Sequence, residues 1–197
     1  MTRRCFALLA LLLTASTLGV PSRAAAQTDA VGFINQLGVQ AIQVLGPSVS
    51  PAARVQRFRQ LFAADFDLPE IGRFVLGRYW RIATSEQQQQ FLGLLQEYLA
   101  QAYAARLAEY AGEKFQALNA VSQDNETVVL SEITRNDGGK IHVQWHLTNN
   151  GGWKITDAYV AGVSMAVTER DEFASVIQQG GGQIQYLLDR LRQKVAG

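Results

Sequence analysis

The sequence predicts an α+β domain, with helices first and last in the chain and a curved antiparallel sheet of about four strands between them. Three observations support this prediction. Apolar residues recur with a helical period up to residue 112, they alternate with polar residues over 114–161, and the helical period then returns. Helices, strands and helices in that order are typical of an α+β fold with helices packed on one side of the sheet.

Four helices are expected before the sheet, and several carry a clear start signal. Ser50 is an N-cap followed by Pro51 at the first helical position. Thr84 and Gln87 form a capping box at the start of the longest helix. The predicted helices cover 28–45, 51–66, 67–77 and 84–112.

The strands are expected where the apolar period changes to two. Ile141, Val143 and Trp145 alternate with polar residues, and the glycine-rich turns 136–139 and 149–152 separate neighbouring strands. The predicted strands cover 114–121, 126–135, 141–148 and 153–161, and two helices follow around 173–177 and 184–191, on either side of the glycine run 180–182.

The first 26 residues have the pattern of a secretory signal peptide. Arg3 and Arg4 precede an apolar run at 6–13, and the small residues 24–26 provide a cleavage site. The apolar run is too short to cross the ~30 Å hydrocarbon core of a bilayer. We therefore predict that residues 1–26 are a signal peptide and that residues 27–197 are a single domain that works outside the cytoplasm.

Cleavage after Ala26 would change the charge and the cysteine content of the chain. The remaining chain has 15 basic and 17 acidic residues, a net charge of −2, because Arg3, Arg4 and Arg23 are lost. A nucleic-acid-binding domain would carry a basic surplus, so we exclude nucleic acid as a partner. Cys5 is the only cysteine, so the mature domain has no disulfide and must rely on its core.

The two histidines are the only candidates for a metal site in the mature chain. His142 and His146 are four residues apart on a predicted strand and therefore share a face. A metal site needs a third and a fourth ligand nearby, and the sequence places none there. Because strand alternation alone explains the spacing, we interpret the pair as part of a solvated face and predict no metal site.

One acid, Asp157, is a candidate for catalysis. It alternates with Ile155 and Tyr159, so it would be buried if that side faces the core, and it could then act as a general base with a raised pKa. The favoured alternative is a structural carboxylate that accepts hydrogen bonds, because one acid without a second catalytic group makes a poor active site. No catalytic motif occurs in the chain, and we predict that it is not an enzyme.

Three stretches resemble one protein family. They are 74–84, 151–157 followed by 160–164, and 169–173 leading into the glycine run. In their order and spacing they are similar to the MlaC family, also called the toluene-tolerance auxiliary component, over roughly 33–191. The resemblance implies a nuclear-transport-factor-like sheet, an apolar pocket between sheet and helices, no catalysis and no cofactor other than bound phospholipid as cargo.

The resemblance also implies a cellular role. Family members are periplasmic carriers that exchange phospholipid between an outer-membrane lipoprotein complex and an inner-membrane ABC transporter complex with its substrate-binding ring. A related branch is associated with hopanoid lipids, which leaves a hopanoid-associated carrier as an alternative. Two further alternatives are an isomerase-like enzyme that uses Asp157 and an adaptor whose pocket is filled by its own side chains.

Strand alternation and the apolar residues of the helices predict which side chains line the pocket and bind lipid. The assignment depends on register, since a shift by one residue would turn every strand residue to the other face. The predicted lipid-binding residues are Phe74, Trp80, Val129, Ile133, Val143, Trp145, Ile155, Tyr159 and Val163.

Overall fold

The predicted α+β architecture is confirmed by the computed structural model, which describes residues 23–46, 48–110 and 112–196. Helices precede and follow one antiparallel sheet, whose five strands lie in sequence order. The helices are α1 (Arg23–Val44), α2 (Pro51–Asp65), α3 (Leu68–Leu76), α4 (Ser85–Arg106), α5 (Met165–Gln179) and α6 (Ile184–Ala196), with short 3₁₀ helices η1 (Gly77–Arg81) and η2 (Leu107–Tyr110). The strands are β1 (Lys114–Gln123), β2 (Glu126–Thr134), β3 (Lys140–Asn149), β4 (Trp153–Val160) and β5 (Val163–Ser164).

Most of the predicted signal peptide, residues 1–22, lies outside the described residues. Helix α1 begins at Arg23, so the predicted cleavage point after Ala26 falls in its first turn. Cleavage therefore stays a prediction.

The helix starts follow the capping signals in the sequence. The Ser50 hydroxyl accepts a hydrogen bond from the backbone N–H of Ala53 at 3.3 Å. The Thr84 hydroxyl accepts from the Gln87 N–H, and the Gln87 side-chain oxygen accepts in return from the Thr84 N–H, both at 3.1 Å. This reciprocal capping box fixes the start of α4.

The sheet has five strands instead of the predicted four, because the chain turns back after β4. Ala161 and Gly162 both have positive φ, at 50° and 83°, and this turn pairs Val163 with Val160 and Ser164 with Tyr159. The resulting β5 has only two residues, too few to show an alternating pattern in the sequence.

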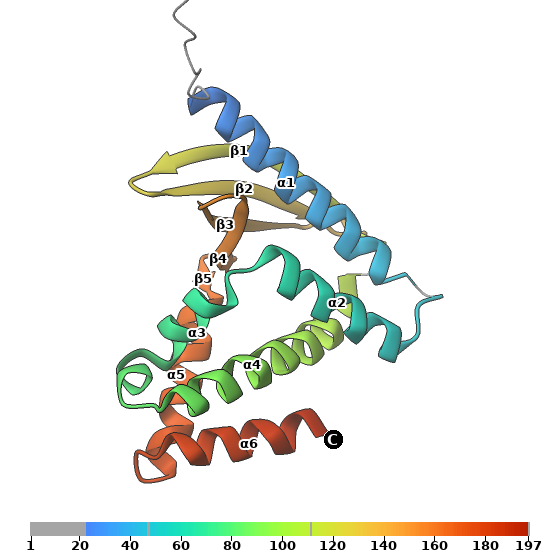
Figure 1. The fold of residues 1–197 in the computed structure, drawn as a ribbon. Helices are drawn as coiled ribbons and strands as arrows, with labels where there is room; N and C mark the ends of the chain where they lie inside the picture. The colour runs from blue at the N-terminus through green and yellow to red at the C-terminus, as the bar shows by residue number, and fades with distance from the viewer. Residues whose placement is uncertain (1–22, 47, 111, 197) are drawn as a thin grey trace, which may run out of the picture.

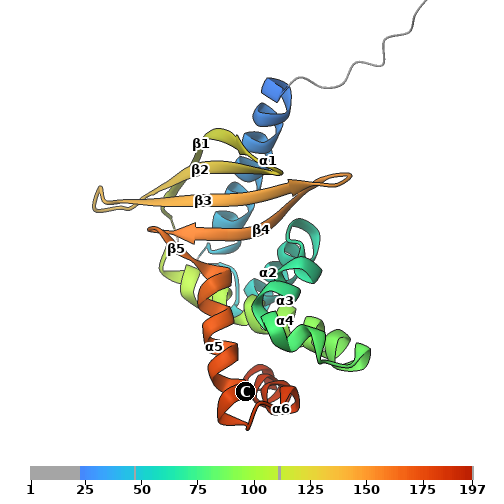
Figure 2. The same ribbon diagram turned by 90° about the vertical axis from the view of Figure 1, so that its left-hand side faces the viewer.

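The helices form two groups around the sheet. Helix α1 runs across one face of the sheet from β1 towards β4, whereas α2 to α6 lie beyond the edge formed by β4 and β5 (Figures 1 and 2). A backbone hydrogen bond joins the second group to the sheet. The N–H of Asp67 donates to the carbonyl oxygen of Ile155 at 2.9 Å. This bond ties the corner between α2 and α3 to β4.

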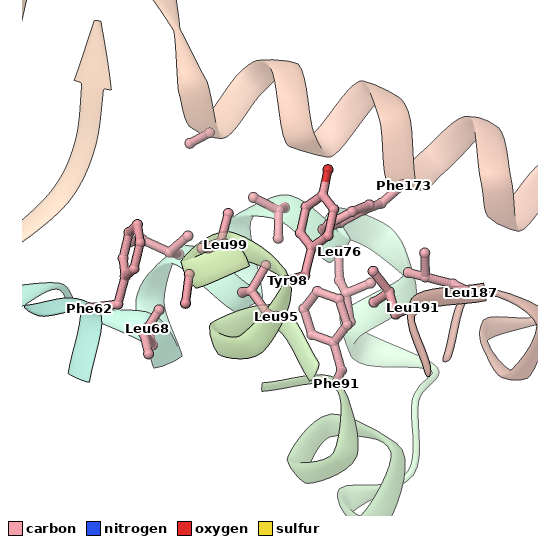
Figure 3. Packing of buried hydrophobic residues seen from close by; sticks show 14 of the residues in the cluster. Phe62, Leu68, Leu76, Phe91, Leu95, Tyr98, Leu99, Phe173, Leu187 and Leu191 are labelled. Carbon is pink, nitrogen blue, oxygen red and sulfur yellow. The ribbon is translucent and has the colours of Figure 1, made fainter. Parts of the chain in front are cut away.

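The larger hydrophobic core belongs to the helices alone. Helix α4 lies at its centre, with Phe91 and Leu95 fully buried against side chains of α3, α5 and α6 (Figure 3). The rings of Phe91 and Phe173 meet edge to face, with 5.8 Å between their centroids. The helical group therefore has a core to which none of the described strand residues contributes.

A second, smaller core joins α1 to the sheet. Ile34 and Leu37 of α1 pack against strand residues that include Leu147. Gly38 allows a close approach, because a Cβ atom built there would lie 2.1 Å from the Phe115 ring of β1. Between this core and the helical core the sheet, α1 and α2 enclose a space that neither fills.

Candidate ligand cavity

The space between the two cores is an apolar cavity that is partly open to solvent. The volume available to the centre of a water molecule is about 210 Å³. One buried water needs only about 15 Å³ by the same measure. The cavity is therefore large enough for part of an organic ligand.

The cavity wall is built from all the layers of the fold. Its side chains are almost entirely hydrocarbon, and those of the described residues include no lysine, arginine or histidine. The apolar lining comprises Leu37, Ala41, Ile42 and Leu45 from α1 and its end, Phe58, Leu61, Phe62 and Phe66 from α2 and its end, Ile71 and Val75 from α3, Leu95, Leu99 and Leu107 from α4 and η2, Phe115, Ile133, Ile141, Val143, Trp145, Ala158 and Val160 from the strands, and Met165 and Ala166 from α5. Gly38 also lines it, and the polar members are Tyr103, Thr156, Asp157 and Glu169.

Three of the nine predicted lipid-binding residues line the cavity, namely Ile133, Val143 and Trp145. The polar edge of Trp145 is satisfied inside the sheet, where its indole N–H donates to the Ser131 hydroxyl at 2.8 Å. Its hydrocarbon surface is thus available to the cavity without an unpaired donor.

Two predicted residues face the same side of the sheet but lie under α1. Val129 and Ile155 are both fully buried, and they pack in the smaller core with Ile34 and Leu147. The predicted direction of their side chains is correct, but helix α1 covers them, so neither lines the cavity. The sequence pattern could not show which part of the sheet a helix would cover.

The prediction that Tyr159 faces the cavity is wrong, and a β-bulge explains the error. The pairing of β3 with β4 shifts between His146 and Leu147, so the alternation of β4 changes phase after Ile155. Ala158 and Val160 therefore face the cavity. Tyr159 faces the other side, where its ring centroid lies 4.8 Å from that of His146.

The remaining three predicted residues lie outside the cavity. Phe74 on α3 is 40 % exposed, with the Arg170 guanidinium 5.1 Å from its ring centroid. Val163 on β5 is 54 % exposed, because its neighbour Ser164 takes the buried position. Trp80 in η1 packs half-buried against the outer part of the helical core.

Asp157 is a structural acceptor, as the favoured interpretation proposed. Its Oδ1 accepts hydrogen bonds from the backbone N–H groups of Ala158 and Ala166, at 2.7 and 3.0 Å. Its Oδ2 accepts from the Ser164 hydroxyl at 2.5 Å, and that hydroxyl in turn accepts from the Val167 N–H at 3.0 Å. The carboxylate thus fixes the first turn of α5 to β4, which leaves neither oxygen without a partner.

Sequence reasoning missed the most unusual side chain of the cavity, Glu169 on α5. It is 5 % exposed, and its Oε2 has no hydrogen-bond partner among the described residues. Burial raises the pKa of this carboxyl, the nearby charge of Glu172 raises it further, and Arg106, Tyr98 and Lys194 lower it in part. The sequence does not single out Glu169, because an isolated acidic residue on a helix ordinarily faces solvent.

This raised pKa predicts how the stability of the fold depends on pH. The folded state binds the Glu169 proton more tightly than the unfolded state, whose carboxyl keeps its ordinary pKa of 4.5. The stability that the folded state gains from binding this proton is therefore fully present below that value, and it is lost as pH rises through the raised pKa. Urea unfolding at a series of pH values should show wild type losing stability relative to Glu169→Gln on going from pH 4 upward. Parallel curves for the two proteins would contradict the burial of an ionisable group here.

The two histidines lie on the outer face of the sheet. His146 Nδ1 is 3.0 Å from Glu126 Oε2, and His142 is exposed. Over 23–46, 48–110 and 112–196 no group of three histidine, cysteine or acidic side chains is placed to hold a metal ion. In the same ranges no helix combines the length and the apolar character needed to span a membrane.

The fold and the cavity define a class of protein in which a curved sheet and a helical layer enclose an apolar space. A profile of the family described as MlaC protein matches residues 40–193. The chain belongs to the MlaC family, which confirms the resemblance found in its sequence.

Two relatives support this assignment. The chain is 31 % identical over 121 residues to the toluene tolerance protein ttg2D of Pseudomonas putida, which covers 60 % of this chain and 56 % of that protein. It is 26 % identical over 136 residues to the intermembrane phospholipid transport system binding protein MlaC of Haemophilus influenzae, which covers 66 % and 63 %. The chain therefore matches less than two thirds of the length of either relative.

A solved structure has the same fold. The phospholipid-binding protein from Ralstonia solanacearum, determined in complex with a phospholipid, matches with a TM-score of 0.71 and 24 % identity, covering 85 % of this chain and 97 % of that chain.

Proposed function

We propose that this protein is a periplasmic lipid carrier that holds the acyl chains of a phospholipid in the cavity. The observation that supports this most directly is an apolar cavity of about 210 Å³ whose described lining has no basic side chain. Such a wall favours hydrocarbon and gives a phosphate group no counter-charge, so the headgroup would stay near solvent. The phospholipid in the Ralstonia protein of the same fold agrees with this assignment.

The energetics favour enclosed transport. Each methylene removed from water contributes about 0.8 kcal/mol, so two long acyl chains cannot cross an aqueous compartment unprotected. An apolar cavity removes the methylenes from water and so provides this free energy without any fixed set of polar contacts. The adaptor alternative, in which side chains fill the space, is therefore less favoured than a carrier.

Family membership supports a proposal for the cellular route. We propose that residues 1–26 direct export, and that the mature protein exchanges lipid between an outer-membrane lipoprotein complex and an inner-membrane ABC transporter complex with its substrate-binding ring. The Haemophilus relative is described as part of an intermembrane phospholipid transport system, which supports such a route. No step of this route requires catalysis, and we propose that the protein is not an enzyme.

Native mass spectrometry of the protein purified from the periplasm of a Gram-negative host tests this function. The expected species is the chain from Gln27 onward with one bound phospholipid. A protein that stays free of lipid, even after incubation with phospholipid vesicles, would contradict the carrier function. Identification of the extracted lipid separates a phospholipid carrier from a hopanoid-associated one.

A further inference from the structure

The cavity opens toward solvent at one end of the sheet. Phe115 of β1 pairs with Ile133 of β2, and Ile133 pairs with Ile141 of β3, so these three lining residues form one row across the strands. All three are half-buried, whereas Val143, the next inward-facing residue of β3, is 3 % exposed. Leu107 of η2, the helix that directly precedes β1, also lines the cavity and is half-buried. The row and Leu107 therefore mark the mouth of the cavity.

Arg135 extends the cavity-facing side of β2 beyond this row. Its backbone N–H donates to the carbonyl oxygen of Gly139 at 2.8 Å, so the strand pairing and the alternation of faces continue from Ile133 to Arg135. Its Nε lies 4.0 Å from Oε1 of Glu113, which has the same position relative to Phe115 on the neighbouring strand. The Arg135 side chain is 47 % exposed. Its guanidinium therefore lies at the mouth, on the cavity side of the sheet, where a ligand can reach it.

Arg106 supplies a second cation from the helical layer. It is the last residue of α4 and directly precedes Leu107, which lines the mouth. Its guanidinium carbon lies 5.8 Å from the ring centroid of Tyr103, another residue of the cavity wall, and the residue is exposed. Arg106 and Arg135 thus approach the mouth from the helical layer and from the sheet, whereas the described lining inside it has no basic side chain.

Neighbouring charged groups at this end of the sheet have partners within the protein or are covered. Lys140 Nζ lies 3.0 Å from Glu132 Oε1. Asp137 Oδ1 accepts a hydrogen bond from the Gly139 N–H at 2.8 Å. The Glu113 side chain is 8 % exposed, so a ligand scarcely reaches its carboxylate. Over the described residues, an anion at the mouth is therefore met chiefly by the two arginines.

We propose that Arg135 and Arg106 bind the phosphate of a lipid headgroup at the mouth while the acyl chains fill the cavity. This inference rests on the proposed carrier function. The apolar wall accepts hydrocarbon and gives a phosphate no counter-charge, so the phosphate stops where the wall ends and the cations begin. The planar guanidinium fork matches the two free oxygens of a phosphodiester. The two arginines thereby make the carrier prefer a lipid with a phosphate over one with an uncharged headgroup.

Competition between two lipids with the same acyl chains tests this site. One lipid has a phosphoglycerol headgroup and the other an uncharged hexose headgroup. Both are delivered from the same vesicles, and their occupancies are measured by native mass spectrometry. The wild type should prefer the phospholipid about fivefold, the effect of two partly exposed ion pairs. Arg106→Gln and Arg135→Gln should each reduce the preference to about twofold, and the double variant should bind both lipids equally.

The matched control is Arg57→Gln, which removes an exposed arginine of α2 that does not line the cavity, and it should keep the wild-type preference. Circular dichroism checks that each variant is folded. Equal binding of both lipids by the wild type, or an undiminished preference in the double variant, would overturn the headgroup site and leave the carrier function standing. Binding of neither lipid by the wild type would overturn both.

A free phosphate ion offers the same chemistry as a headgroup phosphate, and calorimetry separates the two sources. Titration of the lipid-free wild type with inorganic phosphate should give no binding signal, because the acyl chains are what hold the phosphate at the mouth. Binding of inorganic phosphate that disappears in the double variant would indicate a site for the free ion and would overturn the assignment to a headgroup.

Discussion

Replacing Val143 by tryptophan should reduce lipid affinity by about tenfold or more. Val143 lies on β3, lines the cavity and is 3 % exposed, so an indole at this position projects into the space that we assign to the acyl chains. Displacing two methylenes costs about 1.6 kcal/mol at about 0.8 kcal/mol each. A factor of ten corresponds to about 1.4 kcal/mol. Lipid occupancy measured by native mass spectrometry after incubation with vesicles reports the loss.

Gln144→Trp is the matched control for this experiment. Gln144 is the next residue on β3 and is exposed on the opposite face of the sheet, so the same indole there leaves the cavity unchanged. Overpacking a core costs about 1–3 kcal/mol, and thermal unfolding shows whether Val143→Trp is folded. A folded Val143→Trp protein with wild-type occupancy would show that lipid does not occupy this cavity.

Alternation predicted the strands well and the cavity wall only in part. In β3 the pattern runs without interruption through the cavity region, so Val143 and Trp145 both line the cavity. In β4 a bulge near Asp157 changes the phase, and Tyr159 turns to the outer face while Ala158 and Val160 turn inward. Nothing in the composition of β4 marks the bulge, because it is visible only in the pairing of β4 with β3.

The cavity itself could not be predicted from periodicity. Apolar residues such as Phe62 and Leu99 line the cavity and also belong to the helical core, so the same stripe serves both roles. The space lies between the helical core, which has α4 at its centre, and the smaller core that joins α1 to the sheet. That arrangement is a property of tertiary packing, and only the family resemblance suggested a pocket in advance.

Asp157→Ala should destabilise the fold by about 2 to 3 kcal/mol. The change removes the acceptor of three hydrogen bonds, and bonds to a charged group contribute about 1.5–3 kcal/mol each. The estimate is smaller than the sum for three such bonds because Asp157 is only partly buried and the bond to Ala158 is local. Chemical denaturation measures the change in the free energy of unfolding.

The effect of Asp157 should also reach the cavity. The carboxylate holds the first turn of α5, and Met165, Ala166 and Glu169 of that helix line the cavity. Asp157→Asn keeps one acceptor oxygen and should cost less stability than alanine, about 1 kcal/mol. Asp171→Ala, an exposed acid on α5, is the control and should stay within about 0.5 kcal/mol of the wild type. If Asp157→Ala were as stable as that control, the hydrogen bonds of Asp157 would not hold α5 in place. The alternative in which Asp157 acts as a catalytic base would then have to be tested again.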